Sequence, residues 1–402
     1  MPLVDLETTG VAVGGAGVAR DADGRVVFVD GALAGERVRV ELTESKARFA
    51  RGVVREVLEP AAGRVEPRCD EVAAGCGGCD MAHADAATQR VAKATMVRDS
   101  FVRIGRLDAP TIDDGPALVD HGFRTTVRAA VADGRAGLRR ARSHESLAVR
   151  SCRVAHPLVE ELLVDGRYGD VGEVTIRVGA RTGERMVVVS SGTVTGVHVP
   201  DDVIVVSDDE LAAGRCAWIH EEVAGRRFRI SAGSFFQTRP DGADALVELV
   251  QSAMSHASPD VLVDLCCGVG LFGATLDAAT VIGVESNRSA VADARLNLET
   301  LVAPDRSARV VHAKFERWTA SAADVVVADP ARAGLGAAGV ATVVATGARR
   351  VVLVSCDPAS LGRDAGLLAS AGYVAGRCTL VDLFPDTSHV EVVTVFDRGE
   401  PA

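Results

Sequence analysis

Three short segments of the sequence combine a thiol, carboxylates and a histidine, and each directly follows or lies near an apolar run. The segments are Asp329-Pro330-Ala331-Arg332-Ala333-Gly334, Ser355-Cys356-Asp357-Pro358 and Phe384-Pro385-Asp386-Thr387-Ser388-His389-Val390-Glu391. Ligands of α/β enzymes bind at the carboxyl ends of parallel strands, where such segments would meet. A thiolate is a nucleophile, and a nearby carboxylate can move a proton. The sequence therefore predicts that these polar segments meet at one edge of a sheet, where a thiol and acids could do chemistry.

A fourth segment has the spacing of a nucleotide-binding turn. The apolar run Val261–Leu265 leads into Cys266-Cys267-Gly268-Val269-Gly270, and Glu285 ends the next apolar run. Glycines let the backbone approach a ligand closely, and a carboxylate on the next strand can accept both hydroxyls of a ribose. A Gly-x-Gly pair also fits a plain strand-to-helix turn, and Gly273 keeps a nicotinamide dinucleotide open as the ligand. The spacing to Glu285 favours a nucleoside-containing cofactor.

In this order, the motifs resemble those of the RNA uracil-5-methyltransferase family, which carries Asp-Pro-x-Arg-x-Gly, Ser-Cys-Asn-Pro and Phe-Pro-x-Thr-x-His-x-Glu. The resemblance covers nearly the whole chain, because Phe235-Phe236-Gln237, the Cys-Gly-Gly-Cys cluster at 76–79 and an amino-terminal barrel also correspond. It implies methyl transfer from S-adenosylmethionine to C5 of a uridine in RNA, with 23S rRNA favoured and tRNA as the alternative substrate. It further implies a class I (Rossmann-like) methyltransferase domain that follows a TRAM barrel.

The resemblance assigns separate roles to the polar residues. C5 of uracil is a poor nucleophile, so the Cys356 thiolate would add to C6 and produce an enolate able to take the methyl group. Glu391 would then remove the C5 proton so that the thiol can leave. The cofactor and the base would be held by Gln237, Cys266, Gly268, Gly270, Glu285 and Asp329. Taken alone, Cys356 also fits a small buried residue at a strand end.

Four of the nine cysteines have a spacing that indicates a metal site: Cys69, Cys76, Cys79 and Cys152. In a reducing cytosol such thiols are expected to bind metal or take part in catalysis, and disulfides are not expected. The family resemblance implies a [4Fe–4S] cluster on these four thiolates. Zinc is the alternative, although three close ligands and one remote ligand are unusual for a zinc ribbon. Cys216, Cys267 and Cys378 are predicted to be packing residues.

The composition of the sequence restricts the cellular location and the binding partners that we expect. The sequence begins without a secretory signal and has no apolar run of membrane-spanning length, so we expect a cytoplasmic protein without membrane contact. Nothing in the sequence implies a protein partner. The formal net charge of −11 argues against general polyanion binding, but eight arginines lie between residues 124 and 153. These arginines fit an RNA-facing surface or a solvated strand face.

We expect three regions. Short alternating strands over residues 1–62 predict a small TRAM- or OB-like β-barrel, in which Lys46, Arg48, Arg51 and Arg55 suit single-stranded RNA. Residues 63–232 predict a β-rich, mainly antiparallel central domain that holds the cysteine cluster. Residues 233–402 alternate buried strands with helices, which predicts a doubly wound α/β domain.

One helix is predicted inside the central region, over residues 85–105, and it could pack on the catalytic domain. Its apolar face is expected to contain Val91, Ala94, Met96, Val97, Phe101 and Ile104, and Gly105 is expected to close it.

The chain departs from the family pattern at three positions. Cys266 replaces an aromatic residue beside the adenosyl group, Lys314 replaces an acid or amide that would contact adenine, and Asp357 replaces Asn after the nucleophile. The first two motivate a rival hypothesis, a catalytically impaired RNA-binding protein of the same fold. A second rival is a metal-containing oxidoreductase with nicotinamide at the glycine turn. Phe235-Phe236 is predicted to hold a flipped base.

Overall fold

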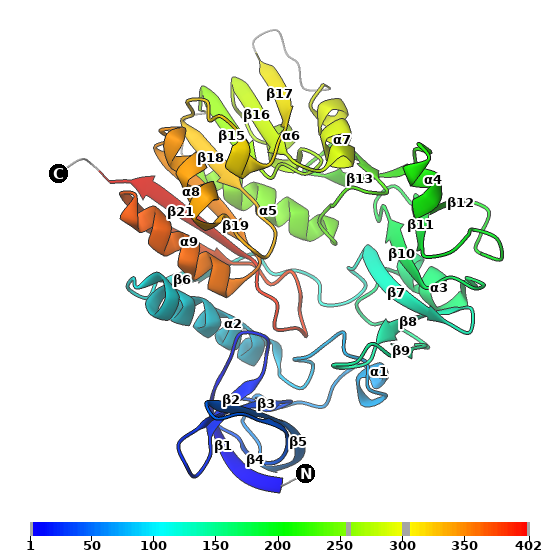
Figure 1. Cartoon of the computed structure of the whole chain (residues 1–402), viewed down its shortest axis with the longest axis vertical. Helices are drawn as coiled ribbons and strands as arrows, with labels where there is room; N and C mark the ends of the chain where they lie inside the picture. The colour runs from blue at the N-terminus through cyan, green and yellow to red at the C-terminus, as the bar shows by residue number, and fades with distance from the viewer. Residues whose placement is uncertain (1–2, 255–258, 300–305, 400–402) are drawn as a thin grey trace.

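The computed structural model describes residues 3–254, 259–299 and 306–399. Figure 1 shows a barrel at the amino-terminal end, a mostly antiparallel sheet in the middle of the chain, and a large α/β domain at the carboxyl-terminal end. The predicted fold class is therefore confirmed. The boundaries predicted between the three regions stay a prediction.

The barrel is closed by strands in the order β1-β2-β3-β5-β4. The strands are β1 (Leu3–Val11), β2 (Gly17–Arg20), β3 (Val26–Asp30), β4 (Arg37–Ser45) and β5 (Phe49–Glu59). Alternate valines and alanines point inward, and Val27, Val29, Val38 and Val40 are fully buried. Because side chains alternate between the two faces of a strand, this pattern closes a small core. The basic residues predicted to meet RNA are partly neutralised, since Lys46 and Arg51 pair with Glu44 and Arg55 pairs with Glu41.

The central region contains a six-stranded sheet and a separate hairpin. The sheet order is β12-β11-β10-β7-β8-β9, and its pairs are antiparallel except β11 with β12. Its strands are β7 (Thr126–Ala132), β8 (Arg135–Arg139), β9 (Ser146–Leu147), β10 (Glu173–Val178), β11 (Arg185–Ser190) and β12 (Val203–Ser207). The hairpin is β13 (Trp218–Val223) with β14 (Arg226–Ser231), and the helices are α1 (Asp70–Ala73), α3 (Pro157–Asp165) and α4 (Asp208–Ala212).

The carboxyl-terminal region is built on an eight-stranded sheet in the order β17-β16-β15-β18-β19-β21-β20-β6. The strands are β15 (Val261–Leu265), β16 (Thr280–Glu285), β17 (Ser307–His312), β18 (Val325–Ala328), β19 (Arg350–Ser355), β20 (Tyr373–Leu380), β21 (Val392–Arg398) and β6 (Ile112–Asp114). The first five are parallel, so their carboxyl ends lie at one edge. The helices are α5 (Pro240–Ala253), α6 (Leu271–Thr275), α7 (Arg288–Glu299), α8 (Gly336–Ala345) and α9 (Pro358–Ser370), with a 3-10 turn at Phe315–Arg317.

The predicted helix over 85–105 is present, but its buried face differs from the prediction. It forms α2 (Ala86–Ser100) and continues as a π-helical turn, η1 (Phe101–Gly105). Val91 is 66% exposed and Ile104 is 46% exposed, so both assignments to the apolar face were wrong. Buried Lys93 lies inward instead, because its ammonium reaches Asp382 at 2.6 Å and a buried charge needs such a partner.

The end of this helix also differs from the prediction. Gly105 is not the left-handed cap, because Arg106 takes that conformation with φ of 57°. Gly105 is needed for close packing: a Cβ at this position would lie 2.6 Å from the carbonyl oxygen of Gly362 in α9. The end of the helix therefore packs tightly against α9.

Candidate functional site

A cavity of about 560 Å³ lies at the carboxyl ends of β15, β16, β18 and β19. Every predicted catalytic and cofactor residue lines it except Gly270. The lining residues from these predictions are Gln237, Cys266, Gly268, Glu285, Asp329, Cys356 and Glu391. The topology brings them together because parallel strands end at one edge of the sheet.

The glycine turn and Glu285 form one end of this cavity. Cys266 and Gly268 have positive φ values of 62° and 55°, which folds the backbone back after β15. The Gly268 N–H donates to Glu285 Oε2 at 3.0 Å, and the Asn287 N–H donates to Oε1 at 2.6 Å. The carboxylate is thereby fixed at the end of β16, where it still lines the cavity and can accept further hydrogen bonds.

Gly270 has a structural position. It precedes α6 with φ of 90°, a conformation that favours glycine, and it lies outside the cavity lining. Below the turn, buried Asp264 accepts a hydrogen bond from the Gly273 N–H at 2.9 Å. Burial raises the pKa of Asp264 to about 8. The prediction that Gly270 touches the cofactor receives no support from this placement.

Two buried carboxyl groups face the other end of the cavity. Asp329 follows β18 and accepts a hydrogen bond from Gln237 Nε2 at 3.1 Å, while Glu391 precedes β21. Burial raises the pKa of both acids, and the negative charge of Asp329 raises the pKa of Glu391 further. Two nearby buried carboxyls resist losing both protons, so the pair is suited to holding and moving a proton near neutral pH.

Cys356 is half-buried and lines the same cavity after β19. Burial raises the pKa of its thiol to about 11, and the charges of Glu391 and Asp329 act in the same direction, while Arg332 lowers it. The thiol is therefore protonated at neutral pH in the free protein. To become a nucleophile it must give its proton to a base, and the two carboxyl groups are the neighbours suited to take it.

This pKa gives a direct test of the thiol. We expect iodoacetamide to alkylate Cys356 slowly at pH 7, and the rate to rise with a midpoint near the pKa of about 11. The Glu391→Gln variant removes a negative charge and should lower that midpoint. Peptide mass spectrometry follows alkylation of Cys356 separately from the other cysteines. An unchanged free-thiol midpoint of about 8.5 in the wild-type protein would contradict the shift.

Several cavity residues were not singled out from the sequence. Asn287, Phe315 and Arg332 line the cavity, and only Arg332 belongs to a quoted motif. Lys314, which stands where an acid or amide would contact adenine, is exposed, whereas its neighbours Ala313 and Phe315 face the cavity. Alternation of side chains after β17 could have indicated this arrangement.

The two neighbouring phenylalanines point in opposite directions. Phe235 is 65% exposed and lines the cavity, so it can stack on a base. Phe236 is buried and packs on Phe228 with ring centroids 5.8 Å apart, so its assignment to a flipped base was wrong.

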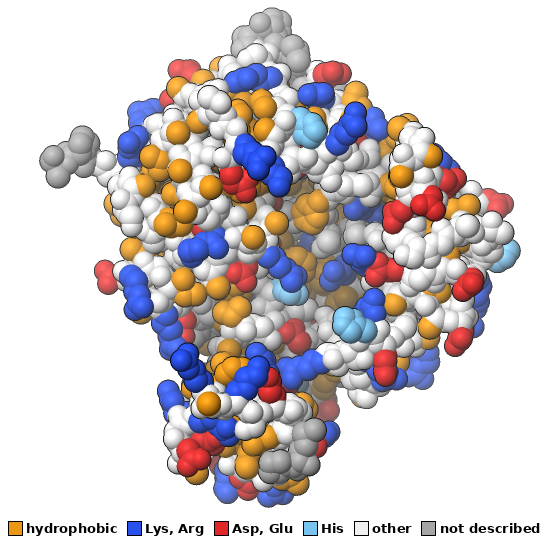
Figure 2. All heavy atoms as spheres, in the orientation of Figure 1, with side chains coloured by type: hydrophobic (Ala, Val, Ile, Leu, Met, Phe, Trp, Pro, Cys, Tyr) orange, Lys and Arg blue, Asp and Glu red, His pale blue; other side chains and the backbone are white. Residues whose placement is uncertain are grey.

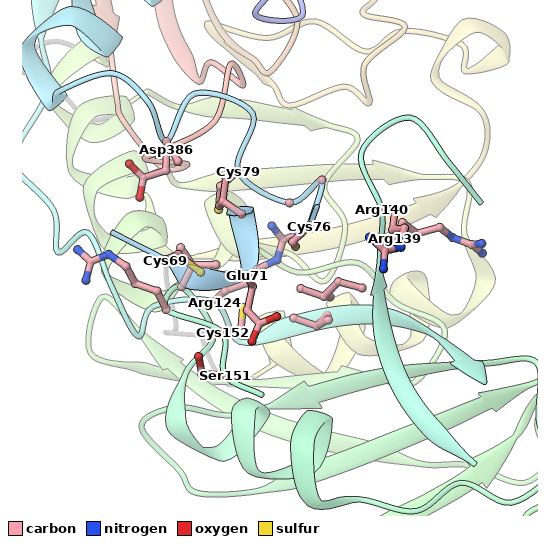
Figure 3. A pocket seen from close by; sticks show the side chains of 18 of the residues that line it. Cys69, Glu71, Cys76, Cys79, Arg124, Arg139, Arg140, Ser151, Cys152 and Asp386 are labelled. Carbon is pink, nitrogen blue, oxygen red and sulfur yellow. The ribbon is translucent and has the colours of Figure 1, made fainter. Parts of the chain in front are cut away.

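The four predicted metal-ligand cysteines line a second cavity of about 280 Å³. Figure 3 shows Cys69, Cys76, Cys79 and Cys152 around this space, with Asp386 beside Cys79. Burial raises the pKa of Cys79 to about 12, and Asp386 and the other three thiols raise it too. Within the described ranges, no group of three or more metal-binding side chains has the arrangement of a metal site.

The remaining cysteines are also placed. Cys267 and Cys378 are buried as predicted, but Cys216 is exposed, so its assignment to packing was wrong. One residue joins the two cavities: Arg124 lines both, and burial lowers the pKa of its guanidinium.

Basic side chains surround the hollow in the face shown in Figure 2. The arginine-rich segment contributes several residues to the wall of the cysteine cavity, but many of these pair with acids. Arg128 pairs with Glu173, Arg150 with Glu71 at 3.4 Å and Arg153 with Asp120 at 2.8 Å. The segment therefore has less free positive charge than its arginine count indicates.

The comparisons with known proteins agree with this architecture. Residues 3–54 match the TRAM domain model. The chain is 36% identical, over 98% of both chains, to an uncharacterized RNA methyltransferase of Streptomyces avermitilis. It is also 28% identical to the 23S rRNA (uracil(1939)-C(5))-methyltransferase RlmD of Aeromonas hydrophila, over 93% of this chain and 92% of the relative.

A solved structure has the same fold over almost the whole chain. It is the tRNA (uracil-54, C5)-methyltransferase of Pyrococcus abyssi in complex with S-adenosyl-L-homocysteine, with a TM-score of 0.73 and 21% sequence identity. The match covers 98% of this chain and 100% of the other. With its TRAM barrel, its class I methyltransferase sheet and its full-length relatives, the chain belongs to a family of RNA methyltransferases.

Proposed function

We propose that this protein transfers a methyl group from S-adenosylmethionine to C5 of a uridine in RNA. The observation that carries the proposal is the shared cavity, in which Cys356, Glu391 and Asp329 face the glycine turn and Glu285. A thiol, a pair of acids that hold a proton, and a nucleoside-binding carboxylate are the groups that C5 methylation of a pyrimidine needs.

Each residue would have one role in the reaction. Glu285 would accept the ribose hydroxyls of the cofactor, which when bound supplies an electrophilic methyl group. Asp329 and Gln237 would hold the uracil edge, and Phe235 would stack on the base. Cys356 would lose its proton to Asp329 and form a bond from Sγ to C6 of uracil, which makes C5 nucleophilic and leaves Glu391 free to act as a base. After methyl transfer, Glu391 would take the proton from C5, and the sulfur–carbon bond would break to restore the ring and the thiolate.

The target RNA is a finer part of the proposal. We favour 23S rRNA, with tRNA as the alternative, since RlmD of Aeromonas hydrophila is named for the first and the Pyrococcus abyssi enzyme for the second. Mass mapping of RNA from a cell that lacks this protein would identify the unmethylated nucleotide. A cytoplasmic setting remains a prediction. Over the part of the chain that is described, no helix combines the length and apolarity needed to cross a bilayer.

The activity has a direct test. Purified protein should bind radiolabelled S-adenosylmethionine and transfer the methyl group to total RNA that lacks the modification. Cofactor binding without transfer to any RNA would favour the catalytically impaired RNA-binding protein. Binding of a nicotinamide dinucleotide in place of S-adenosylmethionine would favour the oxidoreductase.

The cysteine cavity is proposed to hold a [4Fe–4S] cluster. The chemistry of the side chains supports this proposal, because four thiols line one cavity and cysteine thiolates are the ligands of such clusters. We call residues 69–81, which contain Cys69, Cys76 and Cys79, the cysteine loop. When bound, the cluster would connect this loop to the arginine-rich segment through Cys152.

Metal analysis of anaerobically purified protein tests this proposal. We expect about four irons per chain and the same amount of acid-labile sulfide, as the cluster requires. Cys79→Ser should lower the iron content, whereas the control Cys216→Ser, at an exposed cysteine outside the cavity, should not. If the protein contains a full equivalent of zinc and no iron, the cluster proposal is wrong and the site binds zinc.

A further inference from the structure

The residue proposed as the base, Glu391, lies at the end of an irregular loop between β20 and β21. We define the catalytic loop as residues 381–391. The Val381 N–H donates to the Glu391 carbonyl at 2.8 Å and closes the loop at its base. On its other side, α2 holds the loop: Lys93 Nζ donates to the Phe384 carbonyl at 2.9 Å. The loop therefore depends on contacts from distant parts of the chain.

Asp80 contacts the catalytic loop at Ser388, three residues before Glu391. Its Oδ1 accepts the Ser388 N–H at 2.8 Å, and its Oδ2 accepts the Ser388 hydroxyl at 2.6 Å. The two residues are 308 positions apart in the sequence. Asp80 directly follows Cys79, and the next residue, Met81, donates its N–H to the Asp386 carbonyl at 2.9 Å. The cysteine loop and the catalytic loop are thus joined at two consecutive residues.

The barrel packs against the same junction. A Cβ at Gly15 would lie 2.8 Å from Asp80 Oδ2 and 3.0 Å from Ser388 Cβ, and the φ of this glycine is +83°. No other residue fits there without displacing the pair. The barrel, the cysteine loop and the catalytic loop therefore meet at one carboxylate.

We infer that Asp80 is a positioning residue that sets the place of Glu391 through Ser388. This inference rests on the proposed function. Asp80 is exposed and lies outside the lining of the catalytic cavity, so it does not contact the reacting atoms. An ionised carboxylate that accepts two hydrogen bonds holds its partner more firmly than neutral groups do. Proton transfer is sensitive to displacements of about 1 Å, so the loop position matters for the last step of the reaction.

If Asp80 has this role, its loss should slow the resolution of the covalent adduct much more than its formation. In Asp80→Ala, Cys356 after β19 and its proton acceptor Asp329 after β18 keep their places, so the adduct should form at nearly the wild-type rate. Its resolution should be slower by about tenfold or more, because Glu391 is no longer held beside C5. The covalent RNA adduct should accumulate in a single turnover while cofactor affinity is unchanged. Asp80→Asn keeps an acceptor for the Ser388 N–H and should restore most of the rate.

Two further variants test whether the slower adduct resolution comes from the contact between Asp80 and Ser388. Ser388→Ala removes only the hydroxyl contact and should give a smaller delay in the same direction. Asp244→Ala is the matched control: Asp244 also accepts a backbone N–H and a side chain, from Ala224 and Arg181, but these belong to the hairpin and the central region. It should leave adduct resolution unchanged.

A second measurement tests the contact without requiring activity. Amide hydrogen exchange over residues 384–391 should be faster in Asp80→Ala than in wild type, since the Ser388 N–H loses its acceptor. Unchanged exchange together with wild-type adduct resolution would overturn the inference. Equal slowing of adduct formation and resolution would overturn it as well, because that result shows general damage. If wild-type protein methylates no RNA, the proposed function fails, and the exchange result still decides the contact.

Discussion

Cys356→Ala should abolish methyl transfer to RNA while the protein still binds S-adenosylmethionine. Without the sulfur, C6 of uracil has no nucleophile to accept, and C5 stays too poor in electrons to take a methyl group. Removal of a nucleophile in a covalent enzyme lowers the rate by roughly 10⁴-fold or more, and we expect a loss of that size here. Cofactor affinity should be unchanged, because the groups proposed to hold the cofactor, Glu285 and Gly268, lie after other strands.

The measurement is transfer of labelled methyl groups to unmodified RNA under single-turnover conditions, with cofactor binding measured by equilibrium titration. Cys216→Ala is the control, since it makes the same substitution at an exposed cysteine outside the cavity. If Cys356→Ala still methylates RNA at a rate near wild type, the covalent mechanism is wrong.

Glu391→Gln should trap the enzyme on its RNA as a covalent adduct. Glutamine has nearly the same shape but cannot take the C5 proton, so the sulfur–carbon bond formed by Cys356 would persist after methyl transfer. Loss of a general base slows the dependent step by about 10²- to 10⁴-fold, and here that step is the elimination. The adduct should appear as a band of lower mobility on a denaturing gel with labelled RNA.

The band should be absent from the double variant Cys356→Ala/Glu391→Gln, which has no sulfur to form the bond. Glu248→Gln changes an exposed glutamate of α5 that does not line the cavity, and it should behave as wild type. A Glu391→Gln protein that turns over at the wild-type rate would assign the base to another residue, and Asp329 would be the next candidate.

The placement of the cavity followed from local patterns in the sequence. Buried apolar runs that alternate with helices predict parallel strands, and parallel strands put their carboxyl ends at one edge. Cys266, Glu285, Asp329 and Cys356 each directly follow or end such a run, so their meeting could be predicted without a structure. The alternating valines of the first region likewise predicted a barrel.

The mistakes concern side-chain direction. Phe236 and Val91 are apolar and were both misplaced, since Phe236 is buried in the core and Val91 faces solvent. An apolar pattern has more than one consistent face in a short segment, and the partner surface selects among them. In α2 the partner surface contains Asp382. Its carboxylate pairs with the buried Lys93, and with Lys93 on the inner face Val91 lies on the outer one.

The order of the strands along the chain, the residue types at their ends and the family of the protein could all be inferred from local sequence patterns. The contacts that support these strand ends could not be inferred in this way. Asp80 reaches Ser388 across 308 positions, and Arg124 lies in the walls of both cavities. Such contacts join segments without a shared local pattern, because their free energy depends on distance in space and not on separation along the chain.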